Sequence, residues 1–553
     1  MGWLKNFLYG LSPKSLSPKK ASKDTGKSAL DKALLENKDI SQLSEELTKY
    51  KIEKNLKINL QRIRSITGNS VDYVIREFKV GSEQVAAAMV FIDGLANSDI
   101  INILIKSLGI SSLGITPAYQ SGKDIYRAVQ ENLLPVNALS ETDTLKDMLE
   151  KVAMGNSALL LEGYNKCFIA DTKGWETRSL DEPEAEAVLR GPHDGFIESL
   201  RVNTALVRRR IRTPWLWFET LQIGALSQTT VSFAYIKGLA KEKVLEELRS
   251  RLKRIDIDGV LESNYLEEFI VDHPYTFFPT VLSTERPDIV CASLLEGRVA
   301  IFTDNSPVVL IIPTVFANMM MSPDDYNELN PIGTFIRSLR WFAYLVAMFL
   351  PGVYVAVLDF HQELLPTPLL MRIVASREGV PLPVMWEAIL MELTFEILRE
   401  AGVRLPKAIG PAISIVGALV LGDAAIRAGI VSPGIVIIVA FTAIASFTTP
   451  TFSLGIAARL LRFVFLLLGG VFGLFGIQFG FFLLLIHLCS LRSFGVPFLS
   501  PLSPLITANL TDLVLRWYWW GLIKRPKLIG DREPQRQDKN QMPRPPKQEE
   551  EES

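Results

Sequence analysis

The chain has 553 residues with 59 Lys and Arg against 60 Asp and Glu, a nearly neutral balance in a length that exceeds one ordinary domain. A net charge of −1 without a clustered basic face gives no reason to expect nucleic-acid binding. The three cysteines lie far apart, and no constellation of catalytic side chains is evident. We therefore expect no enzyme activity, no cofactor and no metal site.

The first 66 residues predict a polar tail followed by a helix. Lys, Ser and Glu dominate residues 1–50, where apolar residues are too sparse to build a core. A polar helix is expected over residues 43–66, outside the hydrophobic core.

The next region has the pattern of a soluble α/β fold. Strand-like runs such as VAAAMVFI alternate with helical patterns such as EKVLEELRSRLKRI. FIDGLA at residues 91–96 and YIKGLA at 235–240 lie 144 residues apart, and each is followed by a helical pattern. We predict two related subdomains, at 67–150 and 151–303, followed by an interfacial connector over 304–334.

The carboxyl-terminal half has the composition of a membrane domain. Between residues 405 and 492, only 6 of 88 residues are Asp, Glu, Lys or Arg, against 22% in the whole chain. Apolar runs at 341–358, 409–421 and 430–447 predict spans of a hydrocarbon core of about 30 Å. Residues 463–491 exceed one crossing and contain five glycines, which permit either a tilted helix or a re-entrant turn.

The charges that flank these runs predict the topology. Arg337 and Arg340 precede the first span, and a basic cluster follows the last, so both ends are expected on the cytoplasmic side after an even number of crossings. Four crossings satisfy this rule. We predict an all-α polytopic membrane domain over 335–495, a membrane-proximal segment over 496–527 and a disordered charged tail over 528–553.

An amphipathic helix over residues 384–400 carries a row of carboxylates. Glu392, Glu396 and Glu400 recur every four residues and share one face, whereas Glu387 lies on a different face. Two interpretations remain open. The helix lies at the interface with its acids in water, or the carboxylates line a water-filled path of an assembly, where an acidic ring attracts cations.

Small residues form a ridge along the helix predicted over 410–429. Its members are Gly410, Ser414, Ala418, Gly422 and Ala425. This spacing lets backbones approach closely, either in ordinary packing within one subunit or along a pore or subunit contact. Asp423 and Arg427 on the same helix form either an interfacial pair or a functional ionic site. The candidate ion-path residues are Glu387, Glu392, Glu396, Asp423 and Arg427.

Longer strings are more specific than any of these patterns. They are DHPYTFFPTVLSTERPDIVCASLLEGRVAIFTDNSPVVLIIP, IVASREGVPLPVMWEAILMELTFEILREAGVRLPKAIGPAISIVGALVLGDAAIRAGIVSP and HLCSLRSFGVPFLSP. These strings resemble the A subunits of spore germination receptors of the GerA family, over roughly residues 70–527. The stretch FPTVLSTERPD is more similar to nutrient-receptor A subunits than to the related sporulation-operon member of the family.

The resemblance implies a multi-pass protein of the inner membrane of a dormant endospore, with its amino-terminal domain on the spore-core side. It implies two partners, a transporter-like B subunit that binds nutrients and a C-subunit lipoprotein, and a homo-oligomeric A subunit that conducts ions. We expect the chain to convert nutrient binding into ion release as a ligand-gated cation channel. The alternatives are a non-conducting membrane scaffold or signal transducer and, third, a secondary transporter with inverted repeats of spans.

Overall fold

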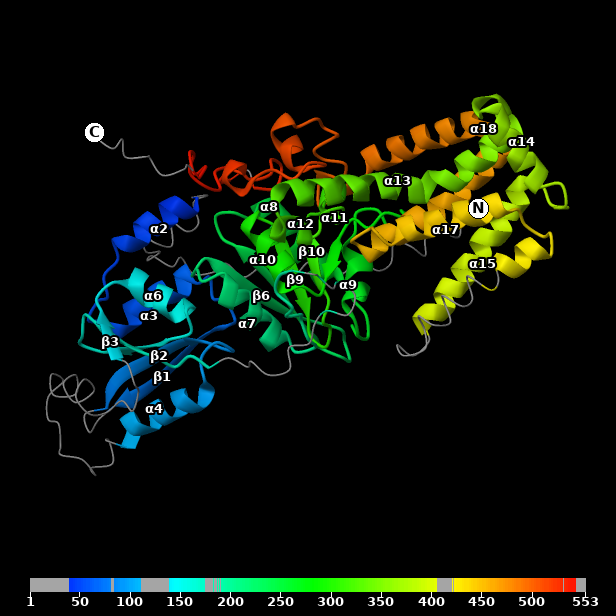
Figure 1. Ribbon diagram of the computed structural model, residues 1–553. Coiled ribbons are helices and arrows are strands. Elements are labelled where there is room, and N and C mark those ends of the chain that lie inside the picture. The colour runs from blue at the N-terminus through cyan, green and yellow to red at the C-terminus, as the bar shows by residue number, and fades with distance from the viewer. Residues whose placement is uncertain are drawn as a thin grey trace, which may run out of the picture.

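The computed structural model describes residues 39–80, 84–110, 139–174, 190–404, 422–530 and 532–543, with the single residues 183, 186, 188 and 420. Figure 1 shows α/β units on one side of the molecule and long helices on the other. The predicted fold class, an α/β amino-terminal half followed by a helical region with apolar helices, is confirmed.

Two helices precede the first sheet, α2 (Ile40–Thr48) and α3 (Leu56–Ile66). The side chain of Asn55 caps α3, because its Oδ1 accepts the backbone N–H of Lys57 at 3.0 Å. The structure corrects the expectation of one polar helix outside the core. Leu60 and Ile63 of α3 are buried, because the apolar residues form a stripe although Lys and Arg dominate the other faces.

The first sheet has five antiparallel strands in the order β1-β2-β4-β5-β3. The strands are β1 (Tyr73–Val80), β2 (Val85–Ile92), β3 (Leu139–Thr142), β4 (Ser157–Leu161) and β5 (Cys167–Ala170). The sheet is a middle layer, because Ala88 and Val90 pack with α3 and α6 (Leu145–Ala153), whereas Ala87 and Met89 pack with α4 (Ser98–Ile110) on the other face.

The second sheet repeats this topology in the order β6-β7-β9-β10-β8. Its strands are β6 (Leu216–Ile223), β7 (Thr229–Ile236), β8 (Leu282–Thr284), β9 (Val299–Thr303) and β10 (Val309–Ile312). Its helices are α7 (Leu200–Arg210), α8 (Glu242–Arg254), α9 (Ser263–Ile270) and α10 (Pro287–Leu295). β7 begins 144 residues after β2 (229 − 85), and β10 begins 142 residues after β5 (309 − 167), so the two units are related.

The duplication extends to single residues. Gly94 and Gly238, the glycines of the repeated Gly-Leu-Ala turn, have φ values of 81° and 86°, which only glycine adopts readily. Asn59 binds both backbone polar groups of Glu53, and Asn203 binds those of Ile197 in the same way.

The predicted boundary between the two subdomains, at residues 150 and 151, falls inside the first sheet. β4 pairs with β2 and β5 pairs with β3, so the first unit continues to Ala170. The pairing of strands separated by a long insertion leaves no local mark in the sequence, because it depends on hydrogen bonds between distant segments.

Buried contacts join the two units. The guanidinium of Arg208, 0% exposed, forms an ion pair with Asp72 at 2.8 Å. It also donates to the backbone oxygens of Thr213 at 2.9 Å and Leu216 at 2.8 Å. The indole nitrogen of Trp217 donates to the backbone oxygen of Ile66 at 3.0 Å. The two units are therefore tied together by saturated polar contacts.

The helical region follows two short helices, α11 (Phe316–Met319) and α12 (Asp324–Asn327). Its elements are α13 (Asn330–Phe360), η3 (Gln362–Leu364), α14 (Thr367–Ser376), α15 (Val384–Arg404), α17 (Pro433–Ser446) and α18 (Phe452–Ser490). Among the described residues, α13 and α18 are long and apolar enough to cross a membrane, and α14 and α17 are shorter apolar helices. The predicted spans at 341–358 and 430–447 coincide with α13 and α17, whereas 409–421 lies outside the described residues apart from residue 420.

α18 consists of two helices that meet at Gly473, where φ is 64° and ψ is −152°. The ring of Phe349 lies 4.5 Å from that of Phe465 and 5.7 Å from that of Phe481. In a straight helix, Phe465 and Phe481 would be about 24 Å apart. The segments 452–472 and 474–490 therefore run antiparallel, and the turn, rather than one tilted helix, is the alternative that the structure supports.

The chain then returns to the second unit. Its elements are β11 (Arg492–Ser493), β12 (Val496–Pro497), η4 (Thr507–Asp512) and η5 (Trp519–Gly521). The described part of the tail expected to be disordered is bound to this segment, because Arg525 N donates to Pro534 O and Arg536 N to Ile523 O, each at 2.8 Å. Backbone bonds thus order residues that carry few apolar side chains, and residues 544–553 lie outside the described chain.

Candidate functional site

The carboxylates of α15 point toward arginines of α18. Glu392 and Arg462 form an ion pair at 2.7 Å, and each side chain is 1% exposed. The Nε of Arg462 also donates to the backbone oxygen of Ala347 on α13 at 2.8 Å. Three helices therefore meet at one buried pair, in which either charge alone would cost several kcal/mol.

A second layer of charge lies one turn away. Glu396 pairs with Arg459 of α18. Arg399 donates to the hydroxyl of Ser446 at 2.8 Å, and its guanidinium lies over the ring of Phe447, 4.7 Å from the centroid. We call five residues the charge cluster: Glu392, Glu396, Arg399, Arg459 and Arg462.

The charge cluster is incompletely saturated. It holds two carboxylates and three guanidiniums, a formal charge of +1. Among the described residues, Glu392 Oε1, Arg399 Nε and Arg462 Nη2 are buried and have no hydrogen-bond partner. A buried polar atom without a partner costs about 1–3 kcal/mol, so this arrangement can gain by exchanging partners or admitting water.

Glu387 lies on another face of α15, as expected, and its surroundings are saturated. Its carboxylate pairs with Arg377 at 2.9 Å and accepts the backbone N–H and hydroxyl of Ser432, at 2.9 and 2.8 Å. Ser432 precedes the first residue of α17, so Glu387 fixes the start of that helix.

The outward face of α15 is apolar. Its exposed side chains are Trp386, Leu390, Leu393 and Ile397. Glu400 at the end of the carboxylate row is exposed and pairs with Arg404 at 2.7 Å, whereas Glu392 is buried and Glu396 is one-third exposed. Glu392 and Glu396 face α18, whose arginines the sequence analysis had not paired with them.

The other candidate residues lie apart from the charge cluster. Asp423 and Arg427 form an exposed pair at 2.8 Å, four residues apart. Gly422 faces α17, where a Cβ would contact the side chain of Val436 at 3.5 Å. Gly410, Ser414 and Ala418 lie outside the described residues.

A second buried ionic site connects the α/β units to α13, and sequence reasoning missed it. Asp325 of α12 is fully buried and accepts from Arg337 at 2.9 Å and from Arg340 at 3.0 Å. Arg337 also pairs with Asp512 of η4 at 2.8 Å. Arg337 and Arg340 can be read directly from the sequence, but there they were used only to predict the topology and not as partners in an ionic site.

Tyr326 extends the same site. Its hydroxyl donates to Asp512 Oδ2 at 2.6 Å, and burial together with the nearby Asp512 carboxylate raises the pKa of Tyr326 above its usual range. The neutral phenol therefore persists as a donor at every physiological pH. We call Asp325, Tyr326, Arg337, Arg340 and Asp512 the junction site.

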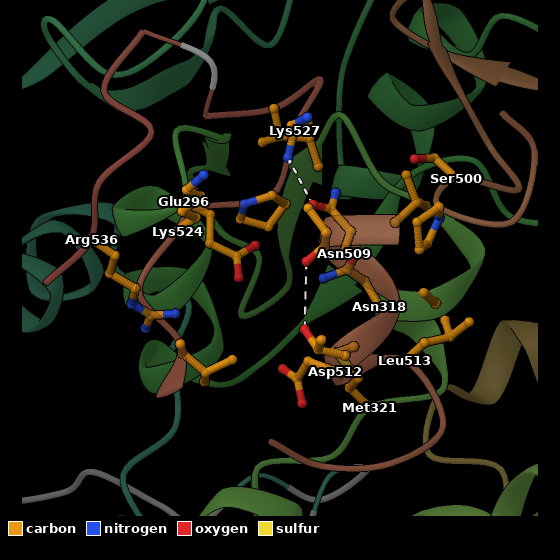
Figure 2. A pocket seen from close by; sticks show the side chains of 18 of the residues that line it. Glu296, Asn318, Met321, Ser500, Asn509, Asp512, Leu513, Lys524, Lys527 and Arg536 are labelled. Atoms are coloured by element: carbon orange, nitrogen blue, oxygen red, sulfur yellow. Dashed lines mark hydrogen bonds between the residues drawn. The ribbon is translucent and has the colours of Figure 1, made fainter. Parts of the chain in front are cut away.

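A cavity of about 100 Å³ lies beside the junction site (Figure 2). Side chains of both charges line it, including Glu296, Asp512 and Lys524. The backbone N–H of Lys527 donates to Asn509 Oδ1 at 3.3 Å across one edge. This volume is large enough for several water molecules, and polar and apolar groups share the lining between η4 and α11.

Comparison with known proteins identifies the family of this chain. Residues 61–528 match the family model described as Bacillus/Clostridium GerA spore germination protein. The chain is 44% identical to spore germination protein KA of Bacillus subtilis (strain 168) over 495 residues, which are 89% of this chain and 90% of that protein.

Two further proteins are similar. Spore germination protein GerLA of Bacillus cereus is 36% identical over 479 residues, 86% of this chain and 96% of that protein. The crystal structure of the N-terminal domain of the A subunit of the Bacillus megaterium spore germinant receptor GerK3 is 36% identical, covering 48% of this chain and 98% of that one with a TM-score of 0.38. The predicted family is confirmed, and the chain belongs to the GerA family of spore germination proteins.

Proposed function

We propose that this chain is the A subunit of a spore germinant receptor, and that its helical region is a ligand-gated cation channel formed by several copies. A transporter-like B subunit binds the nutrient, and a C-subunit lipoprotein completes the receptor in the spore inner membrane. The α/β units lie on the spore-core side.

The charge cluster carries this proposal. Apolar side chains of similar volume would pack a helix bundle at least as stably as a buried ion pair, so the pair is not needed for stability. Ionisable groups at membrane depth point to function. The residues proposed for the ion path are Glu392 and Glu396, with Glu387 on the same helix and Asp423 and Arg427 on the helix predicted over 410–429. The ridge of that second helix consists of Gly410, Ser414, Ala418, Gly422 and Ala425.

The gating follows from the pairing. In the closed arrangement Arg462 and Arg459 neutralise the two carboxylates, so no free acidic row attracts cations. A shift of α15 along α18 would release the carboxylates. By linkage, the nutrient must bind the open assembly more tightly than the closed one, because equal affinity would shift nothing.

The junction site supplies the mechanical connection. Asp325 is paired with both arginines in the first half of α13, so a rotation of the α/β units moves that helix. The turn at Gly473 supports an even number of crossings, since both segments of α18 traverse the bundle and the chain returns to the side of the α/β units.

Cation flux from liposomes tests the proposal. The purified chain, alone and with its B and C partners and nutrient, is compared with Glu392→Gln, Glu396→Gln and Asp423→Asn, and oligomeric size is measured on the same samples. We expect flux from an oligomer, altered strongly by the first two changes and weakly by the third, since Asp423 is exposed.

The alternative is a non-conducting scaffold or signal transducer, in which Glu392 and Glu396 stay paired with Arg462 and Arg459. It predicts that an intact oligomer with partners and nutrient passes no ions. In that case substitutions at the junction site, such as Asp325→Asn, would abolish germination signalling, whereas charge changes at Glu396 would have little effect.

A further inference from the structure

The second α/β unit carries a patch of exposed apolar side chains on α9 and the segments around it. Its members are Leu261, Tyr265, Phe269, Tyr275 and Phe277, and Tyr275 is 98% exposed. Tyr265 and Phe269 are four residues apart on α9 and so share one face, and Leu261 precedes the helix by two residues. We call these five residues the α9 patch. Clustered exposed apolar groups of this kind mark an interaction surface.

The loop that carries Tyr275 and Phe277 is fixed to the end of α18. The hydroxyl of Thr276 is hydrogen-bonded to His487 Nε2 at 2.9 Å. The buried ring of Phe278 packs 6.3 Å from the imidazole of His487. Tyr275 and Phe277 therefore flank a residue that contacts α18, and neither ring is free to fold back into the core.

The length of segment 474–490 indicates the depth in the bilayer at which Thr276 contacts His487. The turn at Gly473 lies against Phe360 and His361, at the end of α13. From that turn the 17 residues of segment 474–490 rise about 25 Å, which is less than the hydrocarbon core of about 30 Å. His487 lies about 21 Å from that turn, so a core of about 30 Å extends about 9 Å past His487, toward the α/β unit that carries the α9 patch.

The surface of α18 leads into the α9 patch. Phe479, Phe482 and Ile486 are exposed along segment 474–490 and end at the turn of helix that contacts Thr276. Figure 1 shows α9 on the side of the second sheet that faces the long helices. The patch therefore continues a surface suited to lipid.

The charges around the patch define what it contacts. Carboxylates of Glu262, Glu267 and Glu268 are interspersed with it in sequence, whereas Asp272 is paired with Arg251 at 2.6 Å. These glutamates would repel anionic headgroups and an acidic protein surface alike. Tyrosine and phenylalanine rings, in contrast, are suited to the layer between headgroups and acyl chains of any lipid charge.

We propose that the α9 patch lies in the interfacial layer of the bilayer and binds lipid directly, holding the second α/β unit against the membrane surface. The inference rests on the proposed crossing of the membrane by α13 and α18. Rotation of the α/β units during gating would then occur in the membrane plane, with the patch as a second point of attachment beside the junction site.

Spin labels on the full chain in phosphatidylcholine nanodiscs test this proposal. Cys167 and Cys291 are buried, and burial raises the pKa of each thiol to about 12, so they escape labelling in a Cys489→Ser background. Labels are placed by Phe277→Cys and Tyr265→Cys. Collisions with oxygen, which concentrates in lipid, are compared with collisions with a water-soluble nickel chelate.

Two controls bracket the result. Phe479→Cys places a label on α18 in lipid, and Ile103→Cys places one on the exposed surface of α4. We expect oxygen collisions to exceed nickel collisions for both patch labels, with values nearer the first control and unchanged by added phosphatidylglycerol. Values equal to those of Ile103→Cys would overturn the proposal, as would protection from both reagents, which means that protein covers the patch. Nickel access at Phe479→Cys would refute the membrane crossing itself, and with it both proposals.

Discussion

Arg208, between the two α/β units, and Arg462, in the membrane helices, are both buried yet differently bound. Each nitrogen of the Arg208 guanidinium has an acceptor, Asp72 or a backbone oxygen. Arg462 has two such bonds, to Ala347 and Glu392, and its Nη2 has no partner among the described residues.

The difference separates a fixed contact from one that can change. A saturated pair loses every bond when it moves, so it holds the two α/β units in one arrangement. An unsaturated pair has a smaller cost of rearrangement, because another arrangement can satisfy the atom that is now without a partner. We infer that contacts are exchanged within the helical region, whereas the two α/β units move together as one body.

The largest expected effect is the loss of stability when the buried pair of Arg208 and Asp72 is broken. Arg208→Met removes a charge and leaves Asp72 buried without compensation, so the free energy of unfolding should fall by about 3–5 kcal/mol. Denaturant unfolding followed by far-ultraviolet circular dichroism measures this. The matched control is Arg64→Met, which breaks an exposed pair with Glu77 and should cost about 0–1 kcal/mol. Equal effects would contradict the contrast between buried and exposed pairs.

The second effect concerns the packing that positions the charge cluster. A Cβ at Gly469 would overlap the backbone oxygen of Gly352, so Gly469→Ala should separate α13 from α18 and destabilise the bundle by about 1–3 kcal/mol. Gly379→Ala is the control, because a Cβ there meets nothing within 4 Å. Thermal unfolding in detergent measures both, and an unchanged midpoint for Gly469→Ala would show that the close approach is absent.

A smaller effect depends on pH. Burial, and then the charge of Glu268, raise the pKa of Glu267 to about 7. Because the folded-state pKa exceeds the unfolded value, the folded state binds more protons between about pH 4.5 and pH 7. Stability should therefore fall as pH rises through that interval, by on the order of 1 kcal/mol after allowance for solvent screening.

Glu267→Gln should remove this pH dependence. The thermal midpoint of the variant should change less between pH 5 and pH 7.5 than that of the wild type. Glu268→Gln should weaken the pH dependence without abolishing it, because it removes the second cause of the raised pKa and leaves the burial of Glu267. A steeper pH dependence in Glu267→Gln would contradict the raised pKa.

The smallest effect is expected at the exposed pair of the helical region. Asp423→Asn breaks an i,i+4 pair with Arg427 on the surface, and such pairs contribute about 0.3–0.5 kcal/mol. Its unfolding midpoint should match the wild type within error. A loss comparable with that of Arg208→Met would mean that other copies of the chain bury this pair.

The repeated α/β unit was predictable because its signal is local. The Gly-Leu-Ala turn needs a glycine at positive φ in each copy, so Gly94 and Gly238 mark equivalent positions by themselves. The limits of the units were not predictable, since strand pairing across long insertions leaves no spacing to read. Leu60 and Ile63 were missed because charged neighbours concealed a buried stripe.

The partners of the candidate site lay beyond sequence reasoning. Glu392 and Arg462 are 70 residues apart, and their contact depends on how α15 packs against α18. That packing depends in turn on the reversal at Gly473, where glycine permits a bend as readily as a close contact. Composition identified the carboxylates but not the arginines that neutralise them.

The most direct test of the central claim is nutrient-dependent cation flux through the receptor with Glu392→Gln and Arg462→Gln combined. Removing both charges leaves neither one buried without its partner and should change stability less than either single substitution, so oligomeric size and unfolding midpoint serve as controls. If the pair gates the path, flux without nutrient should rise by about tenfold for each 1.4 kcal/mol that the pair contributes to the closed state. A double variant that folds, assembles and responds to nutrient as the wild type does would contradict the claim that the charge cluster controls conduction.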